Sequence, residues 1–404
     1  MPDFEEARRI ILEHVAPLGA ERVGLSESLG RVLSDDITAP WDLPLFTNSA
    51  MDGYAVRAAD CRDAKALPII DYVPAGRRAT KSVIPGTAIK IMTGAPLPDG
   101  SDGIVPIEDA EETNGTVRVM RWVALHQHVR FAGEDVRKDE TVLASGTLVR
   151  PYEINMLASI GYEQVTVVRR PKVAIVATGD ELIALGETPS IGQIVNSNSY
   201  SLAAAITSVG ALPVLVGIAR DNVDSHREKL AEGLKADVLI TCAGVSMGDR
   251  DLVREVLDEL GVEIVFWRVK VKPGKALAFG KKEDTLVFAL PGNPVSAMLT
   301  FEEFVAPALL RMMGHRQTVK PLFPAVLQSD LQKKKGQTHL IRVWLEYSGG
   351  KYLAWSAGKQ DTGLLKTLLL ANALAVLPAD RDFFAAGEEI QVHLLDGTVG
   401  MTAL

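Results

Sequence analysis

The sequence contains few cysteines, few aromatic residues and no long apolar run. Cys61 and Cys242 lie far apart without a Cys-x-x-Cys spacing, which argues against a disulfide framework or a zinc site and favours a reducing compartment. The most apolar tract, residues 364–377, contains Lys366 and Asn372 and is shorter than the roughly 20 residues of a membrane helix, so we expect buried core there. The acidic amino terminus does not resemble a signal peptide. We therefore expect a cytoplasmic protein without a membrane partner.

Positive charge is also scarce, because 43 Lys and Arg residues oppose 51 Asp and Glu residues and give a net charge of −8. Broad nucleic-acid binding needs an excess of positive side chains, so nucleic acid is not an expected partner.

Hydrophobic residues make up 47% of the chain and aromatic residues only 6%, which is typical of layered α/β cores. A length of 404 residues exceeds one ordinary core and predicts roughly two to four domains.

The first 170 residues predict a discontinuous domain with a β-domain inserted into it. Asp3 can cap an opening helix whose apolar residues recur at helical spacing: Phe4, Ala7, Ile11, Val15 and Leu18. Pro40 and Pro44 mark a boundary, after which β-prone runs separated by turn signals predict a small barrel or sandwich at 45–138. A helix at Pro151–Ile160 and a following strand can rejoin the first helix, so that residues 1–44 and 139–170 form one domain.

The remainder predicts two further domains. Residues 171–316 alternate between helical stretches and apolar strand candidates, which indicates a doubly wound parallel sheet. Its expected strands are Val173–Ala177, Val214–Ile218, Asp237–Thr241 and Thr285–Leu290. Residues 317–404 are mostly β, with a hairpin signal at Ser348-Gly349-Gly350.

Three runs rich in glycine and polar residues follow strands of the predicted sheet: Thr178–Glu181, Gly244–Asp251 and Pro291–Pro294. Ligands of such sheets bind beyond the carboxyl ends of the strands, so one crevice can contain all three runs. Glycines at 179, 244 and 292 would let backbone amides approach a phosphate. The carboxylates of Asp180, Glu181, Asp249 and Asp251 are hard oxygen ligands suited to Mg²⁺.

Other charged residues near these runs allow more than one interpretation. Asp221 lies just before a predicted helix, so it is either a functional carboxylate or a helix cap, and the same alternative applies to Asp180 and Glu181. Lys272-Pro273-Gly274-Lys275 places two ammonium groups around a stiff turn, with Arg268 one helical turn earlier. This arrangement suits a compact oxyanion, and a solvated loop is the alternative.

The run Asn48–Val56 contains Asp52 beside a glycine in a segment too irregular for core, and a second run, Met92–Pro96, contains Thr93. Both runs belong to the inserted β-domain. Their joint action with the α/β domain would therefore require a domain or subunit interface, where pockets are common.

Together these runs resemble the molybdopterin molybdenumtransferase family, to which the carboxyl-terminal domain of gephyrin belongs. The resemblance extends from Phe4 to the carboxyl end, because five runs occur in family order: the two in the β-domain, Thr-Gly-Asp-Glu, Lys-Pro-Gly-Lys and Leu-Pro-Gly-Asn-Pro-Val-Ser. It implies an elongated discontinuous first domain, an inserted β-domain, an α/β domain like that of molybdopterin-adenylylating proteins, and a terminal β-barrel. It also implies a homodimer.

The resemblance implies an enzyme that inserts molybdenum from molybdate, its metal substrate, into adenylylated molybdopterin, releasing AMP with the help of Mg²⁺ or a similar cation. Contact with the molybdopterin adenylyltransferase is a further expectation. The catalytic positions that it implies are Asp52, Thr93, Asp135, Glu181, Asp221 and Asp251, with Glu181 and Asp251 near the metal. The implied substrate-binding positions are Gly179, Asp180, Gly244, Ser246, Gly248, Asp249, Arg268, Lys272, Lys275, Pro291, Gly292, Asn293, Pro294, Ser296, Arg342 and Thr362.

Two departures and two alternatives accompany this resemblance. Arg268 stands where relatives often carry lysine, and the run ending at Thr362 replaces one that commonly contains His and Ser. The α/β part alone also fits a molybdopterin adenylyltransferase or a nucleotide pyrophosphatase, but these functions leave Asp52 and Thr93 unexplained. A non-catalytic scaffold of the gephyrin kind is the other alternative, and the retained charged residues argue against it.

Overall fold

The computed structural model describes residues 1–62, 66–243 and 252–395. The chain divides into two compact units, which we describe separately. The first contains Met1–Glu21, Gly30–Val32 and the chain from Val167 onward, and the second contains Arg22–Leu29 and Leu33–Thr166. Within the described ranges, none of the helices combines the length and apolar character needed to cross a bilayer.

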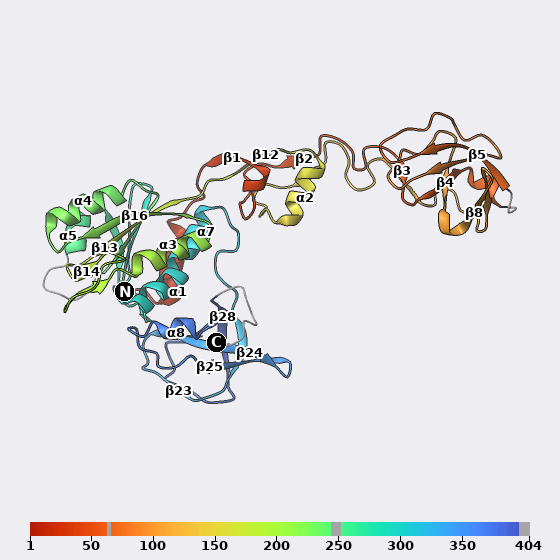
Figure 1. Ribbon diagram of the computed structural model, residues 1–404. Coiled ribbons are helices and arrows are strands. Elements are labelled where there is room, and N and C mark those ends of the chain that lie inside the picture. Colours follow the sequence, from red (N-terminus) through yellow and green to blue (C-terminus); the bar gives the residue numbers. More distant parts are fainter. Residues whose placement is uncertain (63–65, 244–251, 396–404) are drawn as a thin grey trace. The chain divides into compact units, whose positions relative to one another are not determined.

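A six-stranded sheet forms the centre of the first unit (Figure 1). Its strands are β13 (Lys172–Thr178), β16 (Leu212–Ala219), β17 (Val238–Cys242), β18 (Glu263–Trp267), β20 (Ala278–Lys282) and β21 (Thr285–Leu290). Their order is β16-β13-β17-β21-β20-β18, in which the first four strands are parallel and the last two antiparallel. The four predicted parallel strands are confirmed.

Helices cover both faces of this sheet, as Figure 1 shows. On one face, α4 (Val223–Gly233) and α5 (Leu252–Glu259) pack around Leu239. The opposite core surrounds Ile240 and contains α1 (Phe4–Glu13), α3 (Asn198–Ser208), α6 (Pro294–Thr300) and α7 (Ala306–Met312), with the π-helix η4 (Phe301–Val305) between α6 and α7. The doubly wound α/β layer is therefore confirmed.

The opening helix α1 begins where the sequence predicts and ends earlier. Asp3 Oδ1 accepts a hydrogen bond from the Glu6 amide at 2.8 Å, and Glu6 Oε2 accepts one from the Asp3 amide at 3.3 Å, so both form a capping box. Val15 and Leu18 lie beyond the end of the helix at Glu13. Pro17 disfavours helical backbone at the residue before it, so the apolar spacing overestimates the helix.

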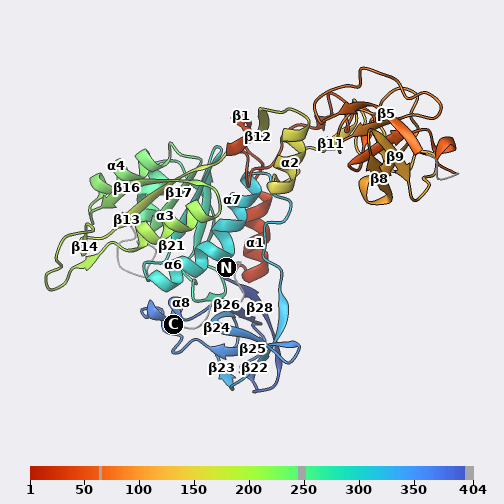
Figure 2. The ribbon, with the colours of Figure 1, turned by 45° about the vertical axis from the view of Figure 1, so that its right-hand side comes forward.

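The carboxyl-terminal strands close into a barrel (Figure 2). Five strands form it: β22 (Phe323–Leu327), β24 (Thr338–Ser348), β25 (Lys351–Ser356), β26 (Ala373–Leu377) and β28 (Glu389–Leu394). The predicted hairpin joins β24 and β25, with Ser348 opposite Lys351 and Gly349 and Gly350 at positive φ. A two-residue strand from the α/β part, β19 (Val271–Lys272), pairs with β24. The predicted terminal β-barrel is confirmed.

The apolar tract 364–377 is only partly buried, which corrects the expectation of core. Its second part forms the buried strand β26, but Leu365 is 47% exposed and Leu369 is 82% exposed. These leucines lie at and within the one-turn helix α8 (Lys366–Leu369), which is too short to turn one face inward. Smaller elements of this unit are β14 (Leu182–Ile183), β15 (Ile194–Val195), β23 (Leu331–Gln332) and β27 (Phe383–Phe384).

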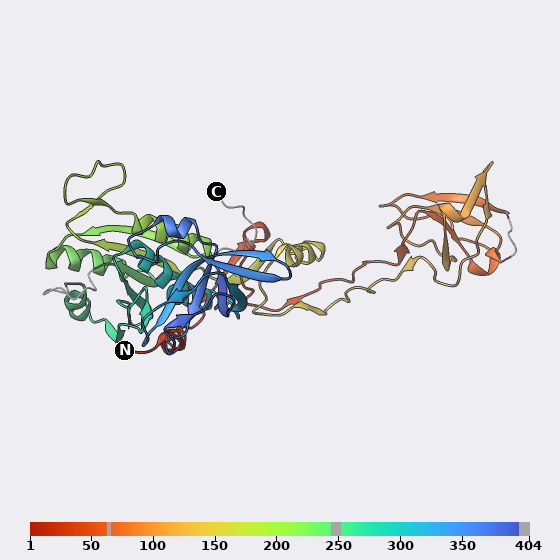
Figure 3. The ribbon, with the colours of Figure 1, turned by 90° about the horizontal axis from the view of Figure 1, so that it is seen from below.

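The second unit contains the predicted inserted β-domain. Its six-stranded sheet has the order β7-β4-β6-β5-β9-β8. These strands are β4 (Gly53–Val56), β5 (Ala66–Val73), β6 (Ala88–Ile91), β7 (Gly103–Pro106), β8 (Ala110–Thr113) and β9 (Thr116–Val119). The segments that enter and leave this domain run side by side where β2 (Ile37–Thr38) pairs with β11 (Thr141–Leu143) (Figure 3).

The same unit contains the predicted helix α2 (Pro151–Ser159), which Gly161 follows at positive φ. Its remaining elements are η1 (Leu25–Glu27), β3 (Asn48–Ser49), η2 (Ala58–Cys61), η3 (Ile107–Asp109) and β10 (Val129–Arg130), while β1 (Ala20–Gly24) and β12 (Gln164–Val168) lie where the chain passes between the units. The division into four domains at the predicted boundaries stays a prediction.

Gly53 gives a test of the inserted sheet. A β-carbon at this position would lie 2.0 Å from the Val105 carbonyl oxygen, because β4 is hydrogen-bonded between β6 and β7. We expect Gly53→Ala to lower the free energy of unfolding by about 2–3 kcal/mol, the cost of overpacking. Urea denaturation followed by tryptophan fluorescence measures it. Gly24→Ala is the control, since its β-carbon would meet nothing closer than 3.8 Å, and an equal loss in both variants would contradict the prediction.

Candidate functional site

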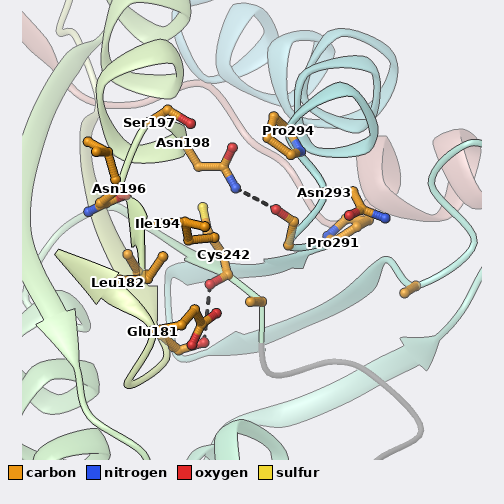
Figure 4. Close-up of a pocket in the computed structure, with 16 residues that line it drawn as sticks. Glu181, Leu182, Ile194, Asn196, Ser197, Asn198, Cys242, Pro291, Asn293 and Pro294 are labelled. Carbon is orange, nitrogen blue, oxygen red and sulfur yellow. Dashed lines mark hydrogen bonds between the residues drawn. The ribbon is translucent and has the colours of Figure 1, made fainter. Parts of the chain in front are cut away.

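A cavity of about 450 Å³ lies at the carboxyl ends of β13, β17 and β21 (Figure 4). Its walls come from the ends of these strands, the segment from β14 to α3, and the loop before α6. The lining residues are Ala177, Thr178, Glu181, Leu182, Ile194, Val195, Asn196, Ser197, Asn198, Cys242, Ala243, Ala276, Pro291, Gly292, Asn293 and Pro294. Two of the three predicted runs therefore meet in one cavity. The candidates in the third run, Gly244, Ser246, Gly248, Asp249 and Asp251, lie outside the described residues.

The Thr178–Glu181 run places a carboxylate at the cavity. Thr178 Oγ1 donates to the Cys242 carbonyl oxygen at 3.1 Å and joins the ends of two neighbouring strands. Gly179 has a φ of 135°, and a β-carbon there would lie 2.2 Å from Glu181 Oε2. Only glycine allows both this backbone conformation and the close approach of the Glu181 side chain.

Asp180 and Asp221 bind each other's backbone. The Asp221 amide donates to Asp180 Oδ1 at 3.1 Å, and the Asp180 amide donates to Asp221 Oδ2 at 3.3 Å. Neither residue caps a helix, because α4 is capped by Asn222, whose side chain accepts from the Ser225 amide at 2.9 Å. Glu181 precedes the strand β14 and is no cap either. The capping alternative is therefore wrong for all three carboxylates.

Arg220 supports the same loop from the neighbouring strand. Its Nη1 lies 3.3 Å from the Gly179 carbonyl oxygen, 3.3 Å from that of Asp180 and 2.9 Å from that of Leu182. One guanidinium thus contacts three carbonyl oxygens of the turn that contains Glu181. The sequence reasoning did not single out Arg220, although its place just after a predicted strand was visible.

An amide-rich wall was also missed. Asn196, Ser197 and Asn198 line the cavity at the start of α3, and Asn198 Nδ2 donates to the Gly292 carbonyl oxygen at 2.8 Å (Figure 4). This bond ties the helix to the 291–294 loop and fixes the orientation of the amide. The Asn-Ser-Asn run between a short strand and a helix was the available signal.

Positive charge gathers where β19 meets the barrel. Lys272 and Lys275 are exposed, and Lys272 is the register partner of His339 on β24. Burial, together with the charges of Lys333 and Lys272, lowers the pKa of His339 to about 4. Burial is the largest cause of this shift, and the two lysines add to it. Arg268 lies in an irregular segment after β18 at a φ of 106°, so the expectation of helical spacing to Lys272 is wrong.

Arg342 is a fully buried guanidinium with unused donors. Its Nη2 donates to the Asp361 carbonyl oxygen at 3.1 Å, whereas Nε and Nη1 have no hydrogen-bond partner among the described residues. Burial lowers the pKa of Arg342, and Asp361 opposes this effect only in part. Buried unpaired donors are costly, which makes this side chain suited to an anion.

Thr362 connects the Arg342 loop to the cavity. Its Oγ1 accepts a hydrogen bond from Asn293 Nδ2 at 3.2 Å, so the loop that follows Gln360 contacts a residue of the cavity wall. Ser296 is buried in the first turns of α6. The structure thus brings together Glu181, the 291–294 loop and Thr362 on the described side of the site.

In the second unit, Asp52 and Thr93 form a pair. Asp52 Oδ1 accepts from the Thr93 amide and from Thr93 Oγ1, both at 2.7 Å. The backbone hydrogen bond and then the hydroxyl lower the pKa of Asp52, so this exposed carboxylate stays ionised below its usual range. Asp135 lies on the returning segment, where its amide donates to the Leu43 carbonyl oxygen at 3.0 Å.

The described residues include no group of three or more His, Cys, Asp or Glu side chains that could hold a metal ion. Glu181 nevertheless fits the expected Mg²⁺, because this ion often uses one or two protein carboxylates and takes its other oxygen ligands from water and phosphate.

Three family models together match most of the chain. The MoeA N-terminal region (domain I and II) matches residues 3–161, a probable molybdopterin binding domain matches 174–311, and the MoeA C-terminal region (domain IV) matches 324–395.

Full-length relatives agree with these matches. The chain is 33% identical to a molybdopterin molybdenumtransferase of Haemophilus influenzae, covering 99% of this chain and 100% of the relative. It is 36% identical to molybdopterin molybdenumtransferase 2 of Mycobacterium tuberculosis, covering 97% and 99%. The crystal structure of the molybdopterin biosynthesis moeA protein from Pyrococcus horikoshii superposes with a TM-score of 0.83 at 32% identity, covering 98% of this chain and 100% of that chain. The chain therefore belongs to the molybdopterin molybdenumtransferase family.

Proposed function

We propose that this chain transfers molybdenum from molybdate to adenylylated molybdopterin and releases AMP, with Mg²⁺ or a similar divalent cation assisting. The name shared by its full-length relatives supports the transfer of molybdenum to molybdopterin. The observation that carries the proposal is the buried Arg342 guanidinium, two of whose nitrogen atoms have no hydrogen-bond partner in the described part of the chain. It lies in a barrel whose loop contacts the cavity through Thr362. A dianion such as molybdate supplies the acceptors that these donors need.

In this proposal, positively charged side chains bind molybdate and carboxylates bind the divalent cation. Lys272, Lys275 and Arg342 would neutralise molybdate and keep it near the cavity. Glu181, and Asp251 outside the described residues, would hold the divalent cation. When bound, this cation neutralises phosphate oxygens and so favours loss of AMP from the phosphoanhydride.

The amide wall would orient the organic part of the substrate. Asn196, Asn198 and Asn293 offer both donors and acceptors in a cavity that is also lined by apolar side chains such as Leu182 and Ile194. That combination suits a flat heterocycle with polar edges, such as a pterin. Asn198 Nδ2 donates to the Gly292 carbonyl oxygen, and its Oδ1 is a buried acceptor without a partner among the described residues.

The proposal includes a cytoplasmic homodimer that receives its substrate from the molybdopterin adenylyltransferase. A direct transfer would protect a reactive phosphoanhydride from water.

A reconstituted reaction tests the function. The purified chain is incubated with adenylylated molybdopterin, molybdate and Mg²⁺, and we measure AMP together with activation of an apo-molybdoenzyme. Release of AMP and active cofactor, both dependent on molybdate, are expected. Adenylylation of molybdopterin from ATP, or cleavage without molybdate dependence, would instead identify one of the alternative enzymes. Absence of any cofactor formation would favour a scaffold.

Asp52 provides a second test. We expect Asp52→Asn to keep the contact with Thr93 and lower molybdenum insertion about 100-fold, a loss typical of removing one preorganised electrostatic group from a site. Asp71→Asn is the matched control, because Asp71 also accepts from a threonine amide and hydroxyl, those of Thr80, at 2.8 Å each. Unchanged turnover in folded Asp52→Asn, or equal losses in both variants, would contradict the prediction.

Replacement of Arg342 should affect the stability of the protein and its binding of molybdate in opposite directions. Arg342→Met removes a buried guanidinium whose Nε and Nη1 lack hydrogen-bond partners among the described residues, so we expect an unfolding free energy equal to or about 1 kcal/mol above that of the wild type. Loss of charge-assisted hydrogen bonds should weaken molybdate binding about tenfold or more. Chemical denaturation and titration calorimetry measure the two quantities. A strongly destabilised variant that still binds molybdate normally would show that the guanidinium serves packing alone.

A further inference from the structure

A buried group of charges joins three elements of the first unit away from the cavity. Glu303, in the π-helix η4, places Oε1 2.6 Å from His393 Nε2 on β28 and Oε2 2.5 Å from Arg8 Nη2 on α1. The side chains are 5% exposed for Glu303, 4% for His393 and 11% for Arg8. Arg8 Nε also donates to the backbone carbonyl oxygen of Glu303 at 3.2 Å. These three residues form what we call the Glu303 clamp.

The geometry around His393 requires a charged ring. Its Nε2 faces the Glu303 carboxylate, and its Nδ1 lies 3.1 Å from the Leu394 carbonyl oxygen. Both neighbours are acceptors, and a neutral imidazole has only one N–H to donate. Only the imidazolium satisfies both contacts.

The other charged groups near His393 are consistent with this state. Burial acts against the charge, but the hydrogen bond and the negative charge of Glu303 outweigh it and raise the pKa of His393. Lys320 lowers it slightly; this lysine pairs with Glu302 and donates to the Leu394 carbonyl oxygen at 3.0 Å. On α1, Glu5 lies 3.3 Å from Arg8 Nη1 and is largely exposed.

The clamp and the site lie along one continuous helical segment. Pro294 begins α6 at the cavity, and the segment continues through η4, where Glu303 lies, into α7. The barrel meets the rest of the unit at the site and at the clamp, and its residues Leu340 and Leu374 also belong to the buried core around Ile240. At the site, β19 pairs with β24 and Asn293 donates to Thr362, whereas at the clamp His393 binds Glu303. Weakening the clamp therefore removes the charged contact among those that hold the barrel and should loosen its docking.

We propose that Glu303, Arg8 and His393 form a charge-dependent clamp that positions the barrel, and with it Arg342 and Thr362, against the 291–294 loop. These are positioning residues, since the described contacts place none of them at the cavity. The expected effect on molybdate rests on the proposed function, but the effect on the barrel does not.

The direction of the pH effect follows from the raised pKa of His393. A group whose folded pKa lies above its unfolded value of 6.5 contributes its full stability below that value and loses it as pH rises through the folded pKa. Docking of the barrel should therefore weaken as the solution becomes alkaline.

Hydrogen exchange measures docking without any substrate. In the full-length wild type, protection factors of peptides covering 338–342 and 358–363, corrected for intrinsic exchange, should fall at least fivefold between pH 6 and pH 9. His393→Gln, which keeps one donor but never carries charge, should show the low value at both pH values. His393→Lys, which stays charged, should restore the high value. Wild-type protection that does not change with pH overturns the clamp, and this result needs no variant to fold.

His14→Gln is the control, because His14 is an exposed histidine on the same side of the sheet, bonded to a backbone carbonyl oxygen and to no carboxylate. It should keep the wild-type pH response. A loss of that response equal to that of His393→Gln would also overturn the clamp.

Steady-state kinetics separates the clamp from the proposed function. At pH 6, His393→Gln should raise the KM for molybdate at least fivefold and change kcat less than twofold, whereas general destabilisation would lower the amount of active enzyme instead. If the wild type inserts no molybdenum but its exchange follows the charge of His393, the proposed function fails and the clamp stands. If molybdenum insertion is normal and hydrogen exchange does not depend on the charge of His393, the clamp proposal is wrong and the proposed function stands.

Discussion

The parallel pairing of β13, β17 and β21 is the constraint on which the site depends. The register sets Ala177 opposite Cys242 and Cys242 opposite Leu290, so the three strands end at the same level. Each strand is aliphatic and buried on both faces, which fixes its depth in the layer. The loops that follow must therefore emerge side by side, and bonds such as that from Asn198 to Gly292 then hold the walls of the cavity together.

Opposite charges then occupy different parts of the first unit. The α/β loops contribute the carboxylates of Asp180, Glu181 and Asp221, whereas the junction with the barrel contributes Lys272 and the buried Arg342. A guanidinium with unpaired donors lowers stability, and the rest of the barrel offsets this through its closed core of aliphatic side chains. Such a distribution separates a wall that carries carboxylates from a wall that carries positive charge.

The sequence predicted those parts of the fold that follow from local pattern. The four parallel strands, α2 and the Ser348–Lys351 hairpin were all recognisable, because continuous aliphatic runs, a proline at a helix start and paired glycines act locally. The predicted end of α1 was wrong, because the apolar spacing continued past Glu13 to residues near Pro17, where helical backbone is disfavoured. The leucines near α8 were also misassigned, because hydropathy does not tell whether a short helix has a neighbour to pack against.

For the site, motif recognition located the loops but not their contacts. The reciprocal bonds of Asp180 and Asp221 depend on β13 and β16 being neighbours, which no local pattern states. The burial of Arg342 and the support given by Arg220 likewise arise from distant segments. Conversely, Gly53 and Gly179 were visible in the sequence. The structure adds the reason for each: the Val105 carbonyl oxygen leaves no room for a β-carbon at Gly53, and the Glu181 carboxylate leaves none at Gly179.

The pairing of β19 with β24 has a consequence for how the chain folds. β19 precedes β24 by more than sixty residues, so during synthesis it leaves the ribosome first, along with most of the sheet beside it. When β24 follows, Thr338 and His339 meet a strand edge that is already in place. That edge gives β24 its alignment before β25, β26 and β28, the three barrel strands that follow it, are complete. The α/β layer thus acts as a template for the domain made after it.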